Sequence, residues 1–115
     1  MAVWDSGKRA EEAAAKFLKN SGYKILERNV RFRFGEIDIV ASKDNQLIFV
    51  EVRFRKSAEF GDSLSTIDAK KQKKLKKAIL TYIRDHNYTG DFRFDAIGVS
   101  GKKFDKIEHI QNIYI

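Results

Sequence analysis

Three acidic residues lie inside two stretches of the chain that otherwise read as buried β-strands. Glu36 and Asp38 interrupt the run GEIDIVA, and Glu51 follows the run LIFV. Residues two apart on a strand share a face of the sheet. Glu36 therefore lies beside Asp38 on one strand. Glu51 lies beside Arg53 on the other, so the acids are gathered on one face rather than scattered.

The turn between the two strands decides which acids face each other. Residues 42–46, SKDNQ, are polar and turn-prone, so the two strands form a hairpin. A two-residue turn at 44–45 sets Asp38 opposite Glu51, and a symmetric four-residue loop gives the same register. A loop of three or five residues would shift the register by one.

Two opposed carboxylates repel each other and weaken strand pairing. When partly buried, one of them must take up a proton or find a cation. Mg²⁺ prefers oxygen ligands and typically uses one or two carboxylates, so it would resolve the conflict between Asp38 and Glu51. The alternative is a solvated face on which Glu36 and Arg53 form a surface ion pair. The residue pattern alone leaves both interpretations open.

The elements that position these residues follow from apolar periodicity. Helical spacing is expected from a cap at Asp5 or Ser6 to a stop at 20–22, and again over 66–86. Strands are expected over 23–32, 36–41, 47–54, 91–100 and 102–115. Within 36–41, Ile37, Ile39 and Ala41 are expected on one face. The order α-β-β-β-α-β-β predicts an α/β fold, a mixed sheet of about five strands flanked by helices, in one domain spanning 1–115.

Composition narrows the partners and the chemistry. The 115 residues include 23 Lys and Arg against 16 Asp and Glu, a net charge of +7 that favours nucleic acid or an anionic membrane as partner, unless the protein is merely basic. The absence of Cys and the distance between the two His argue against thiolate or imidazole metal sites. The N-terminus lacks a long apolar run, so neither a signal peptide nor a membrane span is expected, and the expected location is cytoplasmic.

Lysines crowd the second helix in the run KKQKKLKK, residues 70–77. At about 100° per residue, Lys71 falls in the middle of the apolar arc that includes Leu75 and Tyr82, with Gln72 near its edge. Lys is almost never buried unpaired, so Lys71, and with it Gln72, points at the acidic site or a phosphate, or else Lys71 extends past the core to water. Phosphate contacts are expected from Lys70, Lys73, Lys74, Lys77, Arg28, Arg31, Arg33 and Arg55.

These motifs carry a family resemblance. Asp38 and, thirteen residues later, Glu51-Val52-Arg53 resemble the bipartite signature of the PD-(D/E)xK nucleases, which have the restriction-endonuclease-like fold. The whole chain resembles the small bacterial YraN-like proteins, and it is similar, more distantly, to archaeal Holliday-junction resolvases. The matching stretches are AEEAAAKFLKNSGYKILERNVR, GEIDIVA, IFVEVRFR, FG, KKQKKL and FRFDAIGV, in the family's order over nearly the full length.

The resemblance implies a role for each matching residue. Asp38 and Glu51 would hold Mg²⁺ or Mn²⁺, with the backbone carbonyl of Val52 as a further ligand. Glu11 matches an acidic position that contributes to the site in related resolvases. Arg53 stands where the superfamily has Lys. Because Arg stays protonated, it can orient water or stabilise charge on the phosphate, but it cannot be the general base.

The expected function is metal-dependent hydrolysis of nucleic-acid phosphodiesters, DNA in preference to RNA. Lys71 lies in a stretch that the resemblance includes, and it would add positive charge in the transition state. Glu36 is a second-tier candidate for the site, as is Glu11. Branched DNA as substrate and a homodimeric assembly follow only by analogy with resolvases. The alternatives are a catalytically weak or inactive nucleic-acid-binding module, favoured by Arg53, and an interaction protein whose acids form a salt-bridge network.

Overall fold

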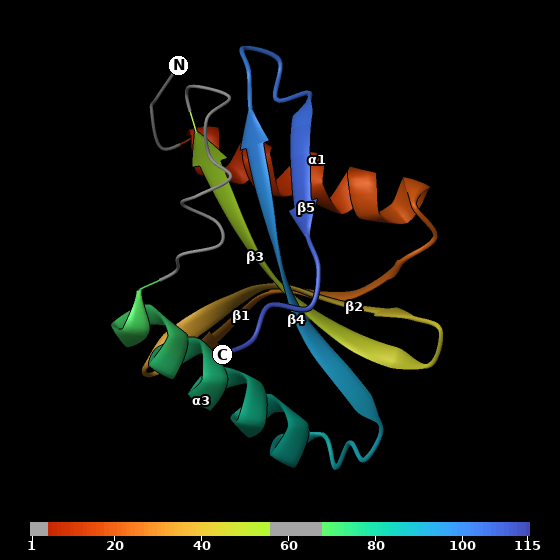
Figure 1. The fold of residues 1–115 in the computed structure, drawn as a ribbon, viewed down its shortest axis with the longest axis vertical. Coiled ribbons are helices and arrows are strands. Elements are labelled where there is room, and N and C mark those ends of the chain that lie inside the picture. Colours follow the sequence, from red (N-terminus) through yellow and green to blue (C-terminus); the bar gives the residue numbers. More distant parts are fainter. Residues whose placement is uncertain (1–4, 56–67) are drawn as a thin grey trace.

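Within the part of the chain that the structure describes, two helices cover opposite faces of a five-stranded sheet (Figure 1). The computed structural model describes residues 5–55 and 68–115. The elements are α1 (Asp5–Asn20), β1 (Lys24–Phe32), β2 (Gly35–Lys43), β3 (Gln46–Arg55), α3 (Ala69–Asp85), β4 (Asp91–Ser100) and β5 (Lys106–Ile110). This is the predicted order and the predicted α/β class. No helix within these residues is long and apolar enough to cross a membrane.

The sheet has the order β1-β2-β3-β4-β5, in which β3 and β4 are parallel and the other neighbours are antiparallel. The hairpin between β2 and β3 turns at Asp44 and Asn45, whose φ angles of 52° and 61° are those that a tight two-residue turn requires. The observed pairs run from Lys43 opposite Gln46 to Ile39 opposite Val50. The predicted register is therefore confirmed.

The central strands are buried on both faces. Under α1, Ile39 and Val50 pack with alanines and Leu18 of the helix, and under α3, Val40 and Phe49 pack with its Leu75, Ile79 and Tyr82. Because α3 covers the face of the sheet that carries Glu51, which is buried, the alternative of an acidic face fully exposed to solvent is excluded.

The alternation of faces along β2 differs from the prediction at one point. Ile37 packs in the cluster under α3, whereas Ile39 and Ala41 pack under α1. The expectation that these three residues share a face was wrong. The period of two breaks at Asp38, where β2 leaves β3.

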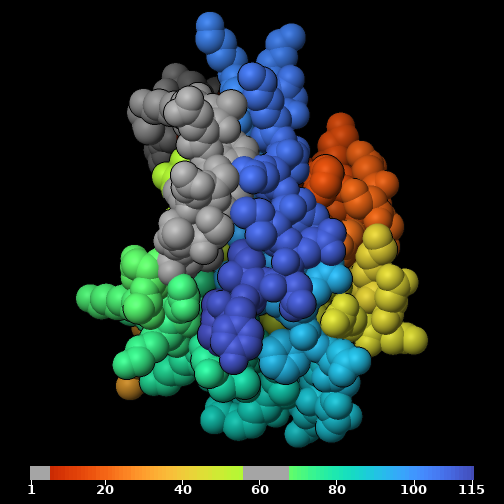
Figure 2. Space-filling view, viewed as in Figure 1, coloured from red at the N-terminus to blue at the C-terminus, as the bar shows by residue number. Residues whose placement is uncertain are grey.

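Two predicted boundaries need correction. Asp68 is extended, with φ −64° and ψ 157°, and its side chain accepts a hydrogen bond from the Lys71 N–H, so α3 begins at Ala69. The predicted start at 66 lies outside the described residues. The last strand is shorter than the expected 102–115, because the chain turns before Lys106 and leaves the sheet after Ile110. The C-terminal residues then lie against α3 (Figure 2).

A glycine cap ends α1 where the segment 20–22 predicted a stop. The Tyr23 N–H donates to the Leu18 carbonyl at 2.9 Å, and the Gly22 N–H donates to the Lys19 carbonyl at 3.1 Å. Gly22 has a φ of 90°, which residues with a Cβ rarely adopt. This cap turns the chain into β1 and so lays β1 beside α1.

Replacing Gly22 by alanine is expected to lower the free energy of unfolding by about 1 kcal/mol, because the cap needs a left-handed backbone. Gly7→Ala is the matched control: Gly7 lies in α1 with nothing within 4 Å of an added Cβ, so it should stabilise the protein by up to about 1 kcal/mol. Urea denaturation followed by circular dichroism measures both. Equal effects of the two substitutions would contradict the role of the cap.

A buried charged network joins β4 to β5, and the sequence did not suggest it. Asp95 is fully buried and accepts from the Arg93 Nε–H at 2.9 Å and the Asn112 N–H at 2.9 Å, and His109 Nε2 lies 2.8 Å from its other oxygen. Arg93 also donates to the Tyr23 hydroxyl at 2.6 Å. Burial alone would raise the pKa of Asp95, but the hydrogen bonds from His109, Arg93 and Asn112 outweigh it and lower that pKa.

Candidate active site

The acidic residues meet where β2 separates from β3. Strand pairing stops at Ile39 opposite Val50, while β3 stays paired with β4 as far as Arg55. One residue beyond the last pair, the Asp38 Oδ2 accepts a hydrogen bond from the Val52 backbone N–H at 2.8 Å. The side chain thus occupies the place of a strand carbonyl, and it fixes a carboxylate at the opening of the sheet.

Asp38 is held in an environment that disfavours its charge. Its pKa is raised to about 7, first by burial and then by the charges of the nearby Glu51, Glu36 and Glu11 carboxylates. The hydrogen bond from Val52 opposes this rise. A cation bound here would reverse this balance, since it favours the ionised carboxylate.

Glu51 is 5% exposed, yet it has two cationic partners. Lys71 on α3 places its Nζ 3.2 Å from the Glu51 Oε2, and the Arg53 Nε lies 3.7 Å from the same oxygen. Lys71 therefore points at the acidic site, as one of the two predictions had it, and does not simply extend to water. Its side chain remains 45% exposed, so it also borders solvent.

Glu11 reaches the site from α1 and is itself ion-paired. Arg28 on β1 lies 3.1 Å from Glu11 and 3.1 Å from Glu12, and the Asn29 side-chain amide donates to Glu11 at 2.9 Å. Arg28, expected to contact phosphate, is thus already engaged by carboxylates. The sequence did not point to Asn29; its only signal is an Asn, a residue depleted in strands, within β1.

Glu36 does not pair with Arg53. Arg31 faces it across β1 and β2, with 3.7 Å between the Arg31 Nε and the Glu36 Oε1. The alternative of a surface pair between Glu36 and Arg53 was therefore wrong. Glu36 forms its ion pair with Arg31 of β1, and Arg53 forms its ion pair with Glu51.

The remaining basic residues are spread around α3 and the β1–β2 turn. Lys77 places its Nζ 4.6 Å from the centroid of the Phe34 ring. Gln72 lines a groove of about 530 Å³ with Ile115 and lysines of α3, and none of the acidic residues lines it. Arg55 is half-buried, and its Nε has no hydrogen-bond partner within the described part of the chain. Of the residues predicted to contact phosphate, the exposed ones are Lys70, Lys73, Lys74, Lys77, Arg31 and Arg33.

The donor set suits a hard divalent cation. Within residues 5–55 and 68–115, no three His, Cys, Asp or Glu side chains lie close enough to share a metal ion. Mg²⁺ needs only one or two carboxylates, because water completes its shell, so Asp38 and Glu51 suffice. The Val52 peptide, whose carbonyl was expected as a further ligand, is tied to Asp38 through its N–H.

Comparison with other proteins gives the chain its family. Residues 10–99 match the model of "Uncharacterised protein family UPF0102". A UPF0102 protein of Thermodesulfovibrio yellowstonii is 43% identical over 114 residues, 99% of both chains. Another from Nitrosomonas europaea is 42% identical over 112 residues, 96% of this chain and 93% of the relative. The match spans both strands of the acidic site and α3, and the chain belongs to the UPF0102 family of YraN-like proteins.

Proposed function

We propose that this protein hydrolyses nucleic-acid phosphodiesters with a divalent metal, DNA in preference to RNA. One observation carries the proposal: the half-buried Asp38, whose pKa is raised to about 7, lies beside Glu51 at an opening of the sheet. A folded chain retains such a destabilised pair where a cation or chemistry compensates for it. The resemblance of Asp38 and Glu51-Val52-Arg53 to the PD-(D/E)xK signature supports the same assignment.

Each side chain has a definite part in this reaction. Asp38 and Glu51 would hold Mg²⁺, which when bound lowers the pKa of a water and neutralises charge on the phosphate. Lys71 borders both Glu51 and solvent, so it can donate to a phosphate oxygen. Arg53 remains protonated and supplies charge, and it takes no proton from water.

The exposed lysines of α3 supply the electrostatic attraction. Lys70, Lys73, Lys74 and Lys77 lie on the same helix as Lys71, which borders the site. Phosphate contacts of this kind release counterions, so binding weakens steeply with salt. A nucleic acid bound along α3 would therefore be led to the acidic residues.

A second function is favoured by the ion pairs of Glu51. Lys71 and Arg53 both form ion pairs with the same carboxylate oxygen of Glu51, so the charges of these side chains are balanced without a substrate or metal. On this basis the protein would be a nucleic-acid-binding module on the same fold, with little or no cleavage.

Cleavage of linear duplex, single-stranded and branched DNA with Mg²⁺ or Mn²⁺ tests the proposal. Asp38→Asn removes the charge and keeps an acceptor for the Val52 N–H, so the fold is preserved. We expect its cleavage rate to fall at least about 100-fold, since even residues that only orient metal ligands cost 10–100-fold. Asp85→Asn, an exposed carboxylate on α3, is the matched control and should cleave like the wild type.

The outcomes separate the two functions. Metal-dependent cleavage that Asp38→Asn lacks supports the hydrolase. Salt-sensitive binding by the wild type without cleavage supports the module. Equal cleavage by the wild type and Asp38→Asn contradicts the assignment of the site.

A further inference from the structure

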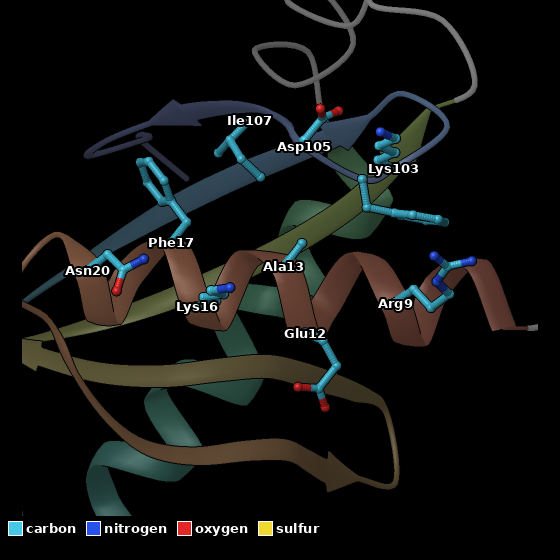
Figure 3. Close-up of a pocket in the computed structure, with 10 residues that line it drawn as sticks. Arg9, Glu12, Ala13, Lys16, Phe17, Asn20, Lys103, Asp105 and Ile107 are labelled. Carbon is cyan, nitrogen blue, oxygen red and sulfur yellow. The ribbon is translucent and has the colours of Figure 1, made fainter.

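A groove of about 510 Å³ lies between α1 and the turn that joins β4 to β5 (Figure 3). None of Asp38, Glu51, Lys71 or Glu11 lines it, so it is separate from the acidic site. Its apolar surface comes from Ala13, Phe17, Phe104 and Ile107, and its cations are Arg9, Lys16 and Lys103.

Positive charge dominates this groove because its two acids are turned elsewhere. Glu12 pairs with Arg28 at 3.1 Å, and its side chain points away from the groove (Figure 3). The Asp105 Oδ1 lies 3.0 Å from where a Cβ on Gly101 would be, so this carboxylate folds back over its own turn. An anionic ligand therefore complements the groove.

Phe104 gives the groove a second feature, a layered aromatic platform. Its backbone has a φ of 55°, which is uncommon for a bulky residue, and its N–H closes the turn onto the Gly101 carbonyl at 3.1 Å. Its ring stacks on Phe54 with 5.0 Å between centroids, and the Arg9 guanidinium carbon lies 4.3 Å from the ring centroid. Arg9 is exposed, so a planar group can reach it from solvent.

We propose that this groove binds a single-stranded segment of nucleic acid. Unpaired bases stack on guanidinium planes and aromatic rings, whereas the paired bases of a duplex are stacked inside it and cannot reach Arg9. Lys16 and Lys103 would contact the phosphates on either side of the stacked base. The proposal needs no metal and does not rest on hydrolysis at Asp38.

Fluorescence anisotropy with a labelled dT12 oligonucleotide tests the charge contacts. It is done in EDTA on the Asp38→Asn background, so that cleavage plays no part. Lys16→Gln/Lys103→Gln removes two exposed cations of the groove, and Lys24→Gln/Arg84→Gln removes two exposed cations elsewhere. The slope of log affinity against log salt should fall by about 1.4 for the groove variant, since each single-strand phosphate contact contributes about 0.7. The control should keep the slope.

A second variant tests stacking. Phe104→Leu keeps an apolar contact with Phe54 and removes the ring beneath Arg9. Without this ring the Arg9 guanidinium is no longer held flat for a base to stack on, so we expect the variant to bind dT12 about 5-fold to 150-fold more weakly, the cost of one lost stacked base. Its affinity for an abasic oligonucleotide of the same length should not change, because the phosphates remain.

Three results would overturn the proposal. One is an unchanged salt slope in the Lys16→Gln/Lys103→Gln variant. Another is an equal loss of affinity for dT12 and for the abasic oligonucleotide in Phe104→Leu. The third is a 12-base-pair duplex whose affinity falls as much as that of dT12 in both variants. None of them bears on cleavage at Asp38, so this proposal and the proposed function fail independently.

Discussion

Replacing Asp38 by asparagine is expected to raise the free energy of unfolding at pH 8 by about 2–4 kcal/mol. The Asp38 pKa of about 7 exceeds that of an ordinary aspartate, about 3.9, by an amount worth about 4 kcal/mol, and partial hydration reduces the effect. The amide is neutral and still accepts from the Val52 N–H. The metal-free protein would thus be less stable with the aspartate that a metal site needs than with asparagine at that position.

The sign of the pH dependence gives a sharper test. Because the folded chain holds the Asp38 proton more tightly than the unfolded chain, this group's contribution is most favourable below about pH 4 and is lost as the pH rises through about 7. The gain in stability from Asp38→Asn should therefore grow between pH 5 and pH 8. Urea unfolding at several pH values measures it; a gain that is constant with pH would contradict the raised pKa.

Added Mg²⁺ provides the control for this effect. A cation that binds the folded wild type stabilises it by mass action, so Mg²⁺ should raise its melting temperature and leave that of Asp38→Asn unchanged. An equal shift of both proteins would mean that Mg²⁺ acts elsewhere on the chain.

Replacing Asp95 by asparagine is expected to lower the free energy of unfolding by about 3–5 kcal/mol, the cost of breaking a buried ion pair by removing one partner. Arg93 and His109 have side chains that are 16% and 9% exposed, and they would lose the carboxylate that balances them. Since interactions in the folded state lower the Asp95 pKa, its contribution is present above about pH 4 and is lost on acidification. The effect of Asp95→Asn should therefore shrink at low pH.

An exposed pair serves as the comparison for Asp95. Arg84 and Asp85 lie 3.1 Å apart on α3, with side chains 76% and 51% exposed, and such pairs contribute at most about 1 kcal/mol. Guanidinium denaturation of Asp95→Asn and Asp85→Asn compares the two directly. Similar small losses in both would mean that the Asp95 network contributes little to stability.

The parts of the site that the sequence predicted are those set by local rules. The two-residue Asp44-Asn45 turn is enough to place Asp38 at the level of Glu51, because it fixes which residues of β2 and β3 face each other. The period of 3.6 is enough to aim Lys71 toward the sheet. Both rules act within one hairpin or one helix, and both predictions were confirmed.

The parts that the sequence did not predict depend on long-range packing. Arg93 and Asp95 are two apart on a strand, and nothing in their spacing shows that Tyr23 and His109 contact them from distant parts of the chain. The alternation of faces along β2 likewise breaks where β2 separates from β3, so that Ile37 packs under α3. The local residue pattern does not show where this separation occurs. Arg28 forms its ion pair with Glu11 of α1 and not with a residue of its own hairpin.

The hydrogen bond from the Val52 N–H to Asp38 has a consequence for how relatives change over time. Loss of the acceptor at position 38 leaves a backbone donor unsatisfied, so folding alone selects for an acceptor there, with or without chemistry. Among the residues that the structure describes, the buried Glu51 side chain makes no such backbone contact, and it brings a charge that must be balanced. A descendant that had abandoned catalysis would therefore keep a hydrogen-bond acceptor at position 38, with asparagine favoured over aspartate, and a carboxylate at both positions is the marker of an active lineage.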